Sequence, residues 1–133
     1  MAVAVLLITH GRLSQNLVET VTEMLGGRLS LATDVLEVRT VQDPELLVKQ
    51  GLRLTEKLDQ GDGVLLLTDA FGSTPSNIAN KVAQAGRCRV VAGVNLPMLI
   101  RIYNYPKLKL DALARTAVEG GQRGVMLCED RHQ

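Results

Sequence analysis

Short runs of consecutive apolar residues recur along the chain and are separated by stretches with helical spacing. The runs cover Val3 to Ile8, Val64 to Thr68 and Val90 to Val94, with a weaker one at Val35 to Val38. Each run ends in a polar or glycine turn, which is typical of parallel strands that are covered on both faces. The pattern therefore predicts four largely buried strands.

Between these runs, apolar residues return every three or four positions, as on one face of an amphipathic helix. One such stretch follows the first run, a second lies between residues 46 and 58, and a third runs from Ile78 to Ala85. Strands that alternate with helices indicate β/α crossovers. The predicted fold class is therefore α/β, with an open, mostly parallel β-sheet flanked by helices on both faces.

Turn and cap residues predict where these elements begin and end. Gly26-Gly27 closes the first helix, Asp43-Pro44 opens the second, and Gly61-Asp62-Gly63 turns into the third strand. A short helix is expected after Pro97, and a final amphipathic helix over Leu108 to Val118.

The C-terminal residues are predicted to add one more strand, over Gly124 to Cys128. The tail from Glu129 to Gln133, which includes His132, is expected to be loose, as chain ends commonly are.

Composition narrows the class of protein. With 133 residues, 46% of them hydrophobic and 22% charged, the chain fits one domain over residues 1–133. The net charge of +1, one Phe and two Tyr argue against nucleic-acid binding.

The first apolar run is too short for a signal core or a membrane span, so we expect a cytoplasmic protein without direct membrane insertion. Cys88 and Cys128 are predicted to be reduced, small core residues.

The tripeptide Thr9-His10-Gly11 directly follows the first apolar run. A residue at the end of a parallel strand lies at the edge where α/β proteins bind their ligands. Imidazole is the side chain that gains or loses a proton near cytoplasmic pH, so His10 is a candidate nucleophile or acid/base. The alternative is a strand-end histidine that hydrogen-bonds only to its own loop.

Asp69 follows the third apolar run, which should lie beside the first strand in a sheet wound from that switch point. A carboxylate bonded to one ring nitrogen fixes the tautomer and leaves the other nitrogen free to attack. Capping of a turn is the alternative role for Asp69.

Gly72, Ser73 and Thr74 form a loop of small residues that leads into a helix. Thr74 is the predicted N-cap, with Pro75 at the first helical position. A helix N-terminus attracts anions, so this loop is a candidate phosphate site, although ordinary helix capping explains it equally well. A histidine, an orienting carboxylate and an anion cradle together suit phosphoryl transfer through a phosphohistidine.

Other chemistries fit the sequence less well. Gly61-Asp62-Gly63 precedes its strand, whereas a dinucleotide fingerprint follows one. One histidine with one carboxylate is too few ligands for zinc, and no GxSxG motif is present for a serine hydrolase. No cofactor or metal is therefore expected. Arg12 either screens a bound anion or is simply solvated.

The chain resembles the IIA component of the mannose-family phosphoenolpyruvate:sugar phosphotransferase system (PTS). The resemblance rests on Ile8 to Gly11, on Leu67 to Asp69 leading into Gly72 to Asn77, and on Ala92 to Leu99, in the order and spacing of the family. It covers essentially the whole chain, and its most specific part is the GVNLPML block.

This resemblance implies that His10 accepts a phosphoryl group from the phosphocarrier HPr and passes it to a IIB protein. Asp69 would hold the non-attacking ring nitrogen, and Gly72, Ser73 and Thr74 would receive the phosphoryl oxygens. It also implies a homodimer in which the C-terminal strand, here Gly124 to Cys128, crosses to the partner as an antiparallel strand. The IIB acceptor is expected on a separate polypeptide.

One departure from the family pattern concerns the loop. The family usually has Gly-Gly-Ser-Pro where this chain has Gly72-Ser73-Thr74-Pro75. If the replaced glycine needs a positive φ, Ser73 is expected to strain the loop.

Two other functions remain open at this point. One is the phosphotransfer subunit of a dihydroxyacetone kinase, which shares the fold and the histidine turn, although the GVNLPML block favours the mannose type. The other is a regulatory protein whose phosphorylation at His10 controls partner binding, because a phosphate beside a helix N-terminus reshapes the surface.

Overall fold

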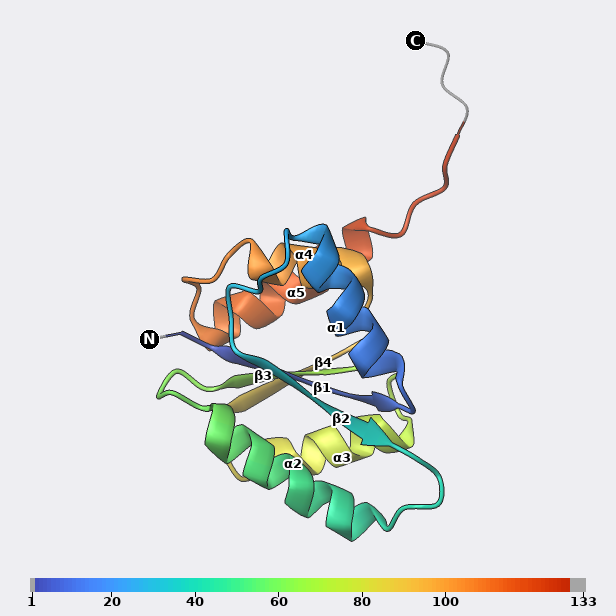
Figure 1. Ribbon diagram of the computed structural model, residues 1–133, viewed down its shortest axis with the longest axis vertical. Helices are drawn as coiled ribbons and strands as arrows, with labels where there is room; N and C mark the ends of the chain where they lie inside the picture. The colour runs from blue at the N-terminus through green and yellow to red at the C-terminus, as the bar shows by residue number, and fades with distance from the viewer. Residues whose placement is uncertain (1, 130–133) are drawn as a thin grey trace.

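The computed structural model describes residues 2–129, which form a four-stranded sheet between two layers of helices (Figure 1). The elements follow one another as β1 (Ala4–His10), α1 (Leu13–Met24), β2 (Thr33–Val38), α2 (Pro44–Leu58), β3 (Val64–Thr68), α3 (Thr74–Ala83), β4 (Cys88–Ala92), α4 (Leu96–Tyr103) and α5 (Leu110–Arg123). The predicted α/β class with helices on both faces is confirmed.

All four strands are parallel and lie in the order β2-β1-β3-β4. After β1 the chain moves to one side to form β2, and then crosses to the other side of β1 to form β3. The direction of winding therefore switches between β1 and β3. In open α/β sheets the crevice at this switch point, beyond the carboxyl ends of the strands, is where ligands bind.

Residues of the central strands alternate between the two helix layers. Val5 and Leu7 of β1 belong to the core shared with α1, α4 and α5, whereas Leu6 and Ile8 belong to the core shared with α2 and α3 (Figure 1). Because both faces are covered, every residue of β1 except His10 is buried. Double coverage explains why this strand reads as an unbroken apolar run.

Helix starts follow the predicted cap chemistry, with one shift. Asp43 caps α2 by accepting a hydrogen bond from the Glu45 amide at 3.0 Å, as expected. The prediction of Thr74 as the cap of α3 was wrong by one residue. Ser73 has the extended backbone that an N-cap requires, at φ −76° and ψ 171°, and its hydroxyl accepts from the Ser76 amide at 3.5 Å.

Helix α5 extends beyond its predicted end at Val118 and passes through two glycines. A Cβ on Gly120 would lie 2.6 Å from Cβ of Arg101, and one on Gly121 would lie 2.9 Å from Cε of Met98. Close contact between α4 and α5 requires glycine at these positions, so the glycines serve packing and do not end the helix. No helix within residues 2–129 combines the length and the apolar character needed to cross a membrane.

The predicted strand over Gly124 to Cys128 is not formed in the single chain. Gly124 is the C-cap of α5, and residues 125–129 pair with no strand of the described chain. The side chains of Val125, Met126 and Leu127 are exposed where this segment leaves the body of the molecule (Figure 1).

Of the two predicted core cysteines, Cys88 packs against the core on the side of α2 and α3, whereas Cys128 does not lie in the core. Cys88 is half-buried at the start of the edge strand β4, and Cys128 is exposed because it follows the last helix. Both are free thiols, in agreement with their predicted reduced state. His132 lies outside the described residues.

Candidate active site

Strands β1 and β3 bring His10 and Asp69 together at the carboxyl end of the sheet. Nδ1 of His10 lies 2.7 Å from Oδ2 of Asp69. The backbone amide of His10 donates a hydrogen bond to the same oxygen at 3.1 Å. One carboxylate oxygen therefore holds both the ring and the main chain of the histidine.

This contact determines the protonation pattern of the neutral ring. An ionised carboxylate only accepts hydrogen bonds, so Nδ1 carries the proton and Nε2 keeps its lone pair. The side chain of His10 is 53% exposed, whereas that of Asp69 is 14% exposed. The site thus combines an oriented nitrogen nucleophile, accessible from solvent, with a carboxylate that is largely enclosed.

The surroundings of Asp69 keep it ionised. Burial by itself raises the pKa of Asp69, but the hydrogen bonds from the His10 ring, the His10 amide and the Ala70 amide, together with the charge of His10, outweigh burial and lower the pKa below its ordinary value. The Ala70 amide donates to Oδ1 at 3.0 Å. Asp69 is therefore an acceptor for the histidine at neutral pH.

The loop after Asp69 adopts an unstrained conformation. The positive φ of this loop, +82°, falls on Gly72, while Ser73 has an ordinary φ of −76°. The strain considered for Ser73 is therefore absent. The Ser73 hydroxyl donates to the carbonyl of Ala70 at 2.6 Å and, as the cap of α3, is committed to the fold of the loop.

The predicted anion cradle lies at the same end of the sheet as His10 but is not joined to it by a hydrogen bond within residues 2–129. In this part of the chain the amides of Gly72 and Thr74 donate to no acceptor, and both residues are exposed. These donors at the start of α3 remain available to an anion. Arg12 is exposed at the N-cap of α1 and makes no side-chain cap.

Two hydroxyl residues, Thr9 and Ser14, flank the histidine turn, and the sequence alone assigns neither of them a role. Thr9 and Ser14 are fully buried, their hydroxyls are hydrogen-bonded to each other, and the Ser14 amide donates to Oγ1 of Thr9 at 2.9 Å. The available signal was a threonine at the end of an apolar run and a serine in the first turn of the next helix.

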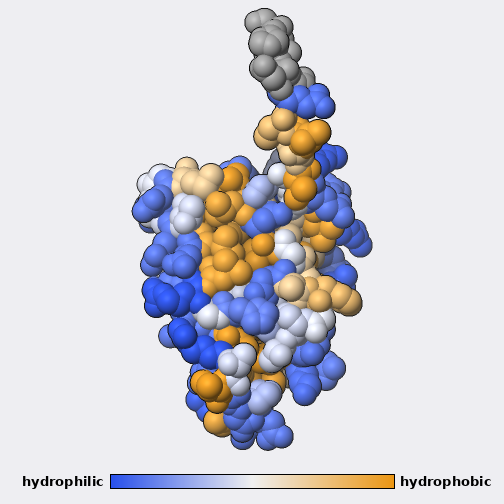
Figure 2. Space-filling model, turned by 90° about the vertical axis from the view of Figure 1, so that its right-hand side faces the viewer, coloured by the Kyte–Doolittle hydropathy of each residue, from blue (hydrophilic) through white to orange (hydrophobic). Residues whose placement is uncertain are grey.

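Apolar side chains interrupt the polar surface at this end of the molecule. Figure 2 looks onto the carboxyl end of the sheet, where hydrophobic and hydrophilic areas adjoin. Leu13 is 40% exposed and Phe71 is 87% exposed, each within three residues of His10 or Asp69. Exposed apolar side chains thus occur close in sequence to both residues of the site.

Comparison with known sequences identifies related proteins. A family profile, EIIA-man, described as "PTS system fructose IIA component", matches residues 4–118. The "PTS system mannose-specific EIIAB component" of Escherichia coli K12 is 31% identical over 128 residues, which make up 94% of this chain and 39% of that protein. The chain thus spans about two fifths of the length of this relative.

Solved structures show the same fold. The "Mannose/sorbose specific IIA subunit of phosphotransferase system" from Enterococcus faecalis superimposes with a TM-score of 0.87 at 24% identity, covering 100% of this chain and 99% of that one. A PTS IIA protein "associated with the fucose utilization operon" from Streptococcus pneumoniae gives a TM-score of 0.79 at 20% identity, covering 96% of each chain.

Proposed function

Since this chain belongs to the EIIA-man family, the mannose-type IIA components of the PTS, we propose that it is a phosphocarrier that receives a phosphoryl group on His10 from HPr and passes it to a IIB component. The observation that carries this proposal is the 2.7 Å contact between Nδ1 of His10 and Oδ2 of Asp69. It leaves one ring nitrogen free for bonding to phosphorus.

In the proposed reaction, the lone pair of Nε2 attacks the phosphorus atom of the donor. The bond from phosphorus to the donor breaks, and its electron pair leaves with the donor. The Nδ1 proton stays in its hydrogen bond to Asp69, so the positive charge that develops on the ring faces a carboxylate. The pKa of Asp69 is below its ordinary value, which keeps that carboxylate ionised throughout.

The loop from Gly72 to Thr74 is the proposed cradle for the phosphoryl oxygens. Its free amides at Gly72 and Thr74 and the positive end of the α3 dipole favour an anion at this edge. Since the Ser73 hydroxyl is engaged within the loop, we assign it to loop geometry, with the amides as the oxygen ligands.

We also propose that the protein acts as a homodimer, with residues 124–128 pairing with the sheet of a second copy. The exposed side chains of Val125, Met126 and Leu127 support this assignment, because a row of exposed apolar residues needs a partner surface. The name of the E. coli relative, an EIIAB component, supports a IIB acceptor for the phosphoryl group.

Incubation with phosphoenolpyruvate, Enzyme I and HPr tests the carrier role. We expect one acid-labile phosphate per chain, detected by intact mass and located by 31P NMR. The His10→Ala variant should take up none, whereas His132→Ala, the matched control at the other histidine, should be labelled like the wild type. Labelling that persists in His10→Ala would rule out His10 as the acceptor.

A second measurement separates a relay from a regulator. A relay should discharge its phosphate on addition of a IIB protein. A regulatory protein would keep the phosphate and change its binding partners with phosphorylation state.

A further inference from the structure

A pair of buried hydroxyls brackets the histidine turn. Thr9 is the residue before His10 in β1, and Ser14 is the second residue of α1. Both residues are 0% exposed. The preceding strand residues, Val5 to Ile8, are all aliphatic and buried. Packing of the core therefore does not by itself require a polar side chain at the end of β1.

The pair replaces a missing helix cap. Arg12 occupies the N-cap position of α1 but makes no side-chain hydrogen bond to the helix. Oγ1 of Thr9 instead accepts from the Ser14 amide at 2.9 Å, and the Ser14 hydroxyl is hydrogen-bonded to it in turn. A normal cap comes from the residue at the helix start and constrains the helix alone. This one comes from the preceding strand and ties α1 to β1.

The hydrogen bonds between Thr9 and Ser14, here called the tie, enclose the turn that carries His10. Residues 10–13 run between the two bonded residues, and the Gly11 amide adds a bond to the carbonyl of Val38 in β2 at 3.0 Å. The ring of His10 has only two side-chain torsions, and its contact with Asp69 fixes the remaining freedom. The position of Nε2 is therefore set by the backbone of this turn.

We propose that Thr9 and Ser14 are positioning residues for the phosphoryl acceptor: their buried hydrogen bonds hold the His10 backbone so that Nδ1 meets Asp69 and Nε2 points toward the donor. The proposal rests on the phosphocarrier function of His10. A displacement of about 1 Å at a reacting atom costs on the order of a hundredfold in rate. Loss of the tie should therefore slow transfer within the bound complex without weakening the binding of HPr.

The test compares Thr9→Val, which keeps the shape and removes the acceptor, with Thr9→Ser, which keeps the hydroxyl. Rapid-quench kinetics with phosphorylated HPr give the rate at saturating donor and the donor concentration at half-saturation. We expect Thr9→Val to lower the saturating rate by about ten- to a hundredfold with unchanged half-saturation, and Thr9→Ser to restore most of it. Ser14→Ala, which retains the backbone bond to Thr9, should lie between them.

Thr55→Val is the matched control. Thr55 is also buried, and its hydroxyl donates to the carbonyl of Leu52 at 2.9 Å in α2, on the opposite helix layer. We expect it to unfold at lower denaturant concentration while keeping the wild-type transfer rate. An equal loss of rate in Thr55→Val and Thr9→Val, or a wild-type rate in Thr9→Val, overturns the positioning role.

A spectroscopic readout separates failure of this proposal from failure of the proposed function. If the wild type accepts no phosphate from HPr, the carrier role fails. 15N NMR of the unphosphorylated His10 ring still decides the positioning role. We expect one tautomer, protonated at Nδ1, in the wild type and in Thr55→Val, and exchange between tautomers in Thr9→Val. An unchanged ring spectrum in Thr9→Val contradicts the proposal.

Discussion

At the carboxyl end of the sheet a Cβ on Gly72 would meet no atom within 4 Å, whereas at the amino end a Cβ on Gly63 would lie 2.7 Å from the Arg87 carbonyl oxygen and 2.9 Å from Cδ2 of Leu110. Both glycines have a positive φ, +82° and +89°. The same backbone conformation thus serves an open loop at one end and close packing at the other. The chain is therefore tightly packed around the glycine at the amino end and open around the one at the carboxyl end.

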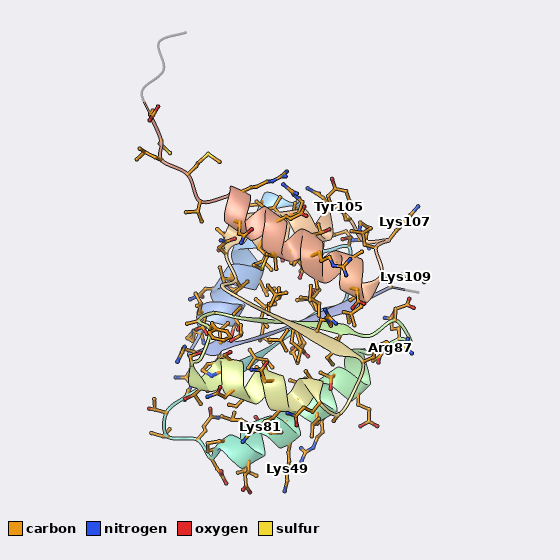
Figure 3. All side chains as sticks on the ribbon, turned by 180° about the vertical axis from the view of Figure 1, so that it is seen from behind. Lys49, Lys81, Arg87, Tyr105, Lys107 and Lys109 are labelled. Atoms are coloured by element: carbon orange, nitrogen blue, oxygen red, sulfur yellow. The ribbon has the colours of Figure 1, made fainter. Side chains whose placement is uncertain are left out.

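The charged side chains at the two ends of the sheet also differ in what they contact. Arg87, Lys107 and Lys109 lie along the amino end (Figure 3). Arg87 donates to the carbonyl of Gly61 at 2.8 Å and so braces the turn before β3. Asp111, the carboxylate in the first turn of α5, pairs with Arg89 at 3.5 Å, between side chains more than half exposed. Such an exposed pair contributes little to stability, whereas the largely enclosed Asp69 holds the ring and the amide of His10.

Replacement of Asp69 should reveal the largest functional difference between the two ends of the sheet. In Asp69→Asn the site loses the charge that faces the His10 ring, and an amide no longer enforces protonation of Nδ1. We expect the rate of phosphate acceptance from HPr to fall by about 10²–10⁴-fold. Asp62→Asn, at the amino end, is the matched control and should transfer phosphate normally. Equal rates in both variants would show that the two ends are not functionally distinct.

The second prediction concerns stability at the amino end. Gly63→Ala combines an unfavourable φ with contacts of 2.7–2.9 Å and should lower the free energy of unfolding by about 2–4 kcal/mol. Gly27→Ala, at a positive φ with no atom within 4 Å, should lose only about 1–2 kcal/mol. Urea denaturation measures both. Similar losses in the two variants would argue against close packing at Gly63.

The smallest effect is a dependence of stability on pH. The pKa of Asp69 is lower in the folded protein than its ordinary value of about 3.9, so its ionised form stabilises the fold. This contribution is fully present above the unfolded-state pKa and is lost as the pH falls through the folded-state pKa. The difference in urea midpoint between wild type and Asp69→Asn should therefore shrink below about pH 4. A constant difference from pH 6 to pH 3 would contradict this assignment.

Much of the fold followed from the sequence because buried parallel strands leave a simple pattern. The run from Val64 to Thr68 matches β3 residue for residue. Edge strand β4 begins earlier than predicted, at Cys88, because an edge strand admits polar and exposed residues such as Arg89. The apolar pattern alone therefore misplaces the ends of edge strands.

The proximity of His10 and Asp69 was predictable because neighbouring parallel strands end at the same edge of the sheet. The Thr9–Ser14 pair was not predictable. In the sequence these two residues look like any other threonine and serine, and only the folded turn brings their hydroxyls together. The extension of α5 beyond Val118 was missed for a related reason, because the sequence does not show that Gly120 and Gly121 pack against α4. Only the packed structure shows that Gly120 faces Arg101 at close range.

The hydrogen bond between His10 and Asp69 is made by atoms that neither form nor break bonds to phosphorus. It is therefore present before and after the proposed transfer, and loading and unloading pass through the same arrangement. Little rearrangement of the protein then adds to the barrier in either direction. Under the proposed function, the direction of phosphate flow through His10 is therefore decided by the supply of charged donor and the demand of empty acceptor.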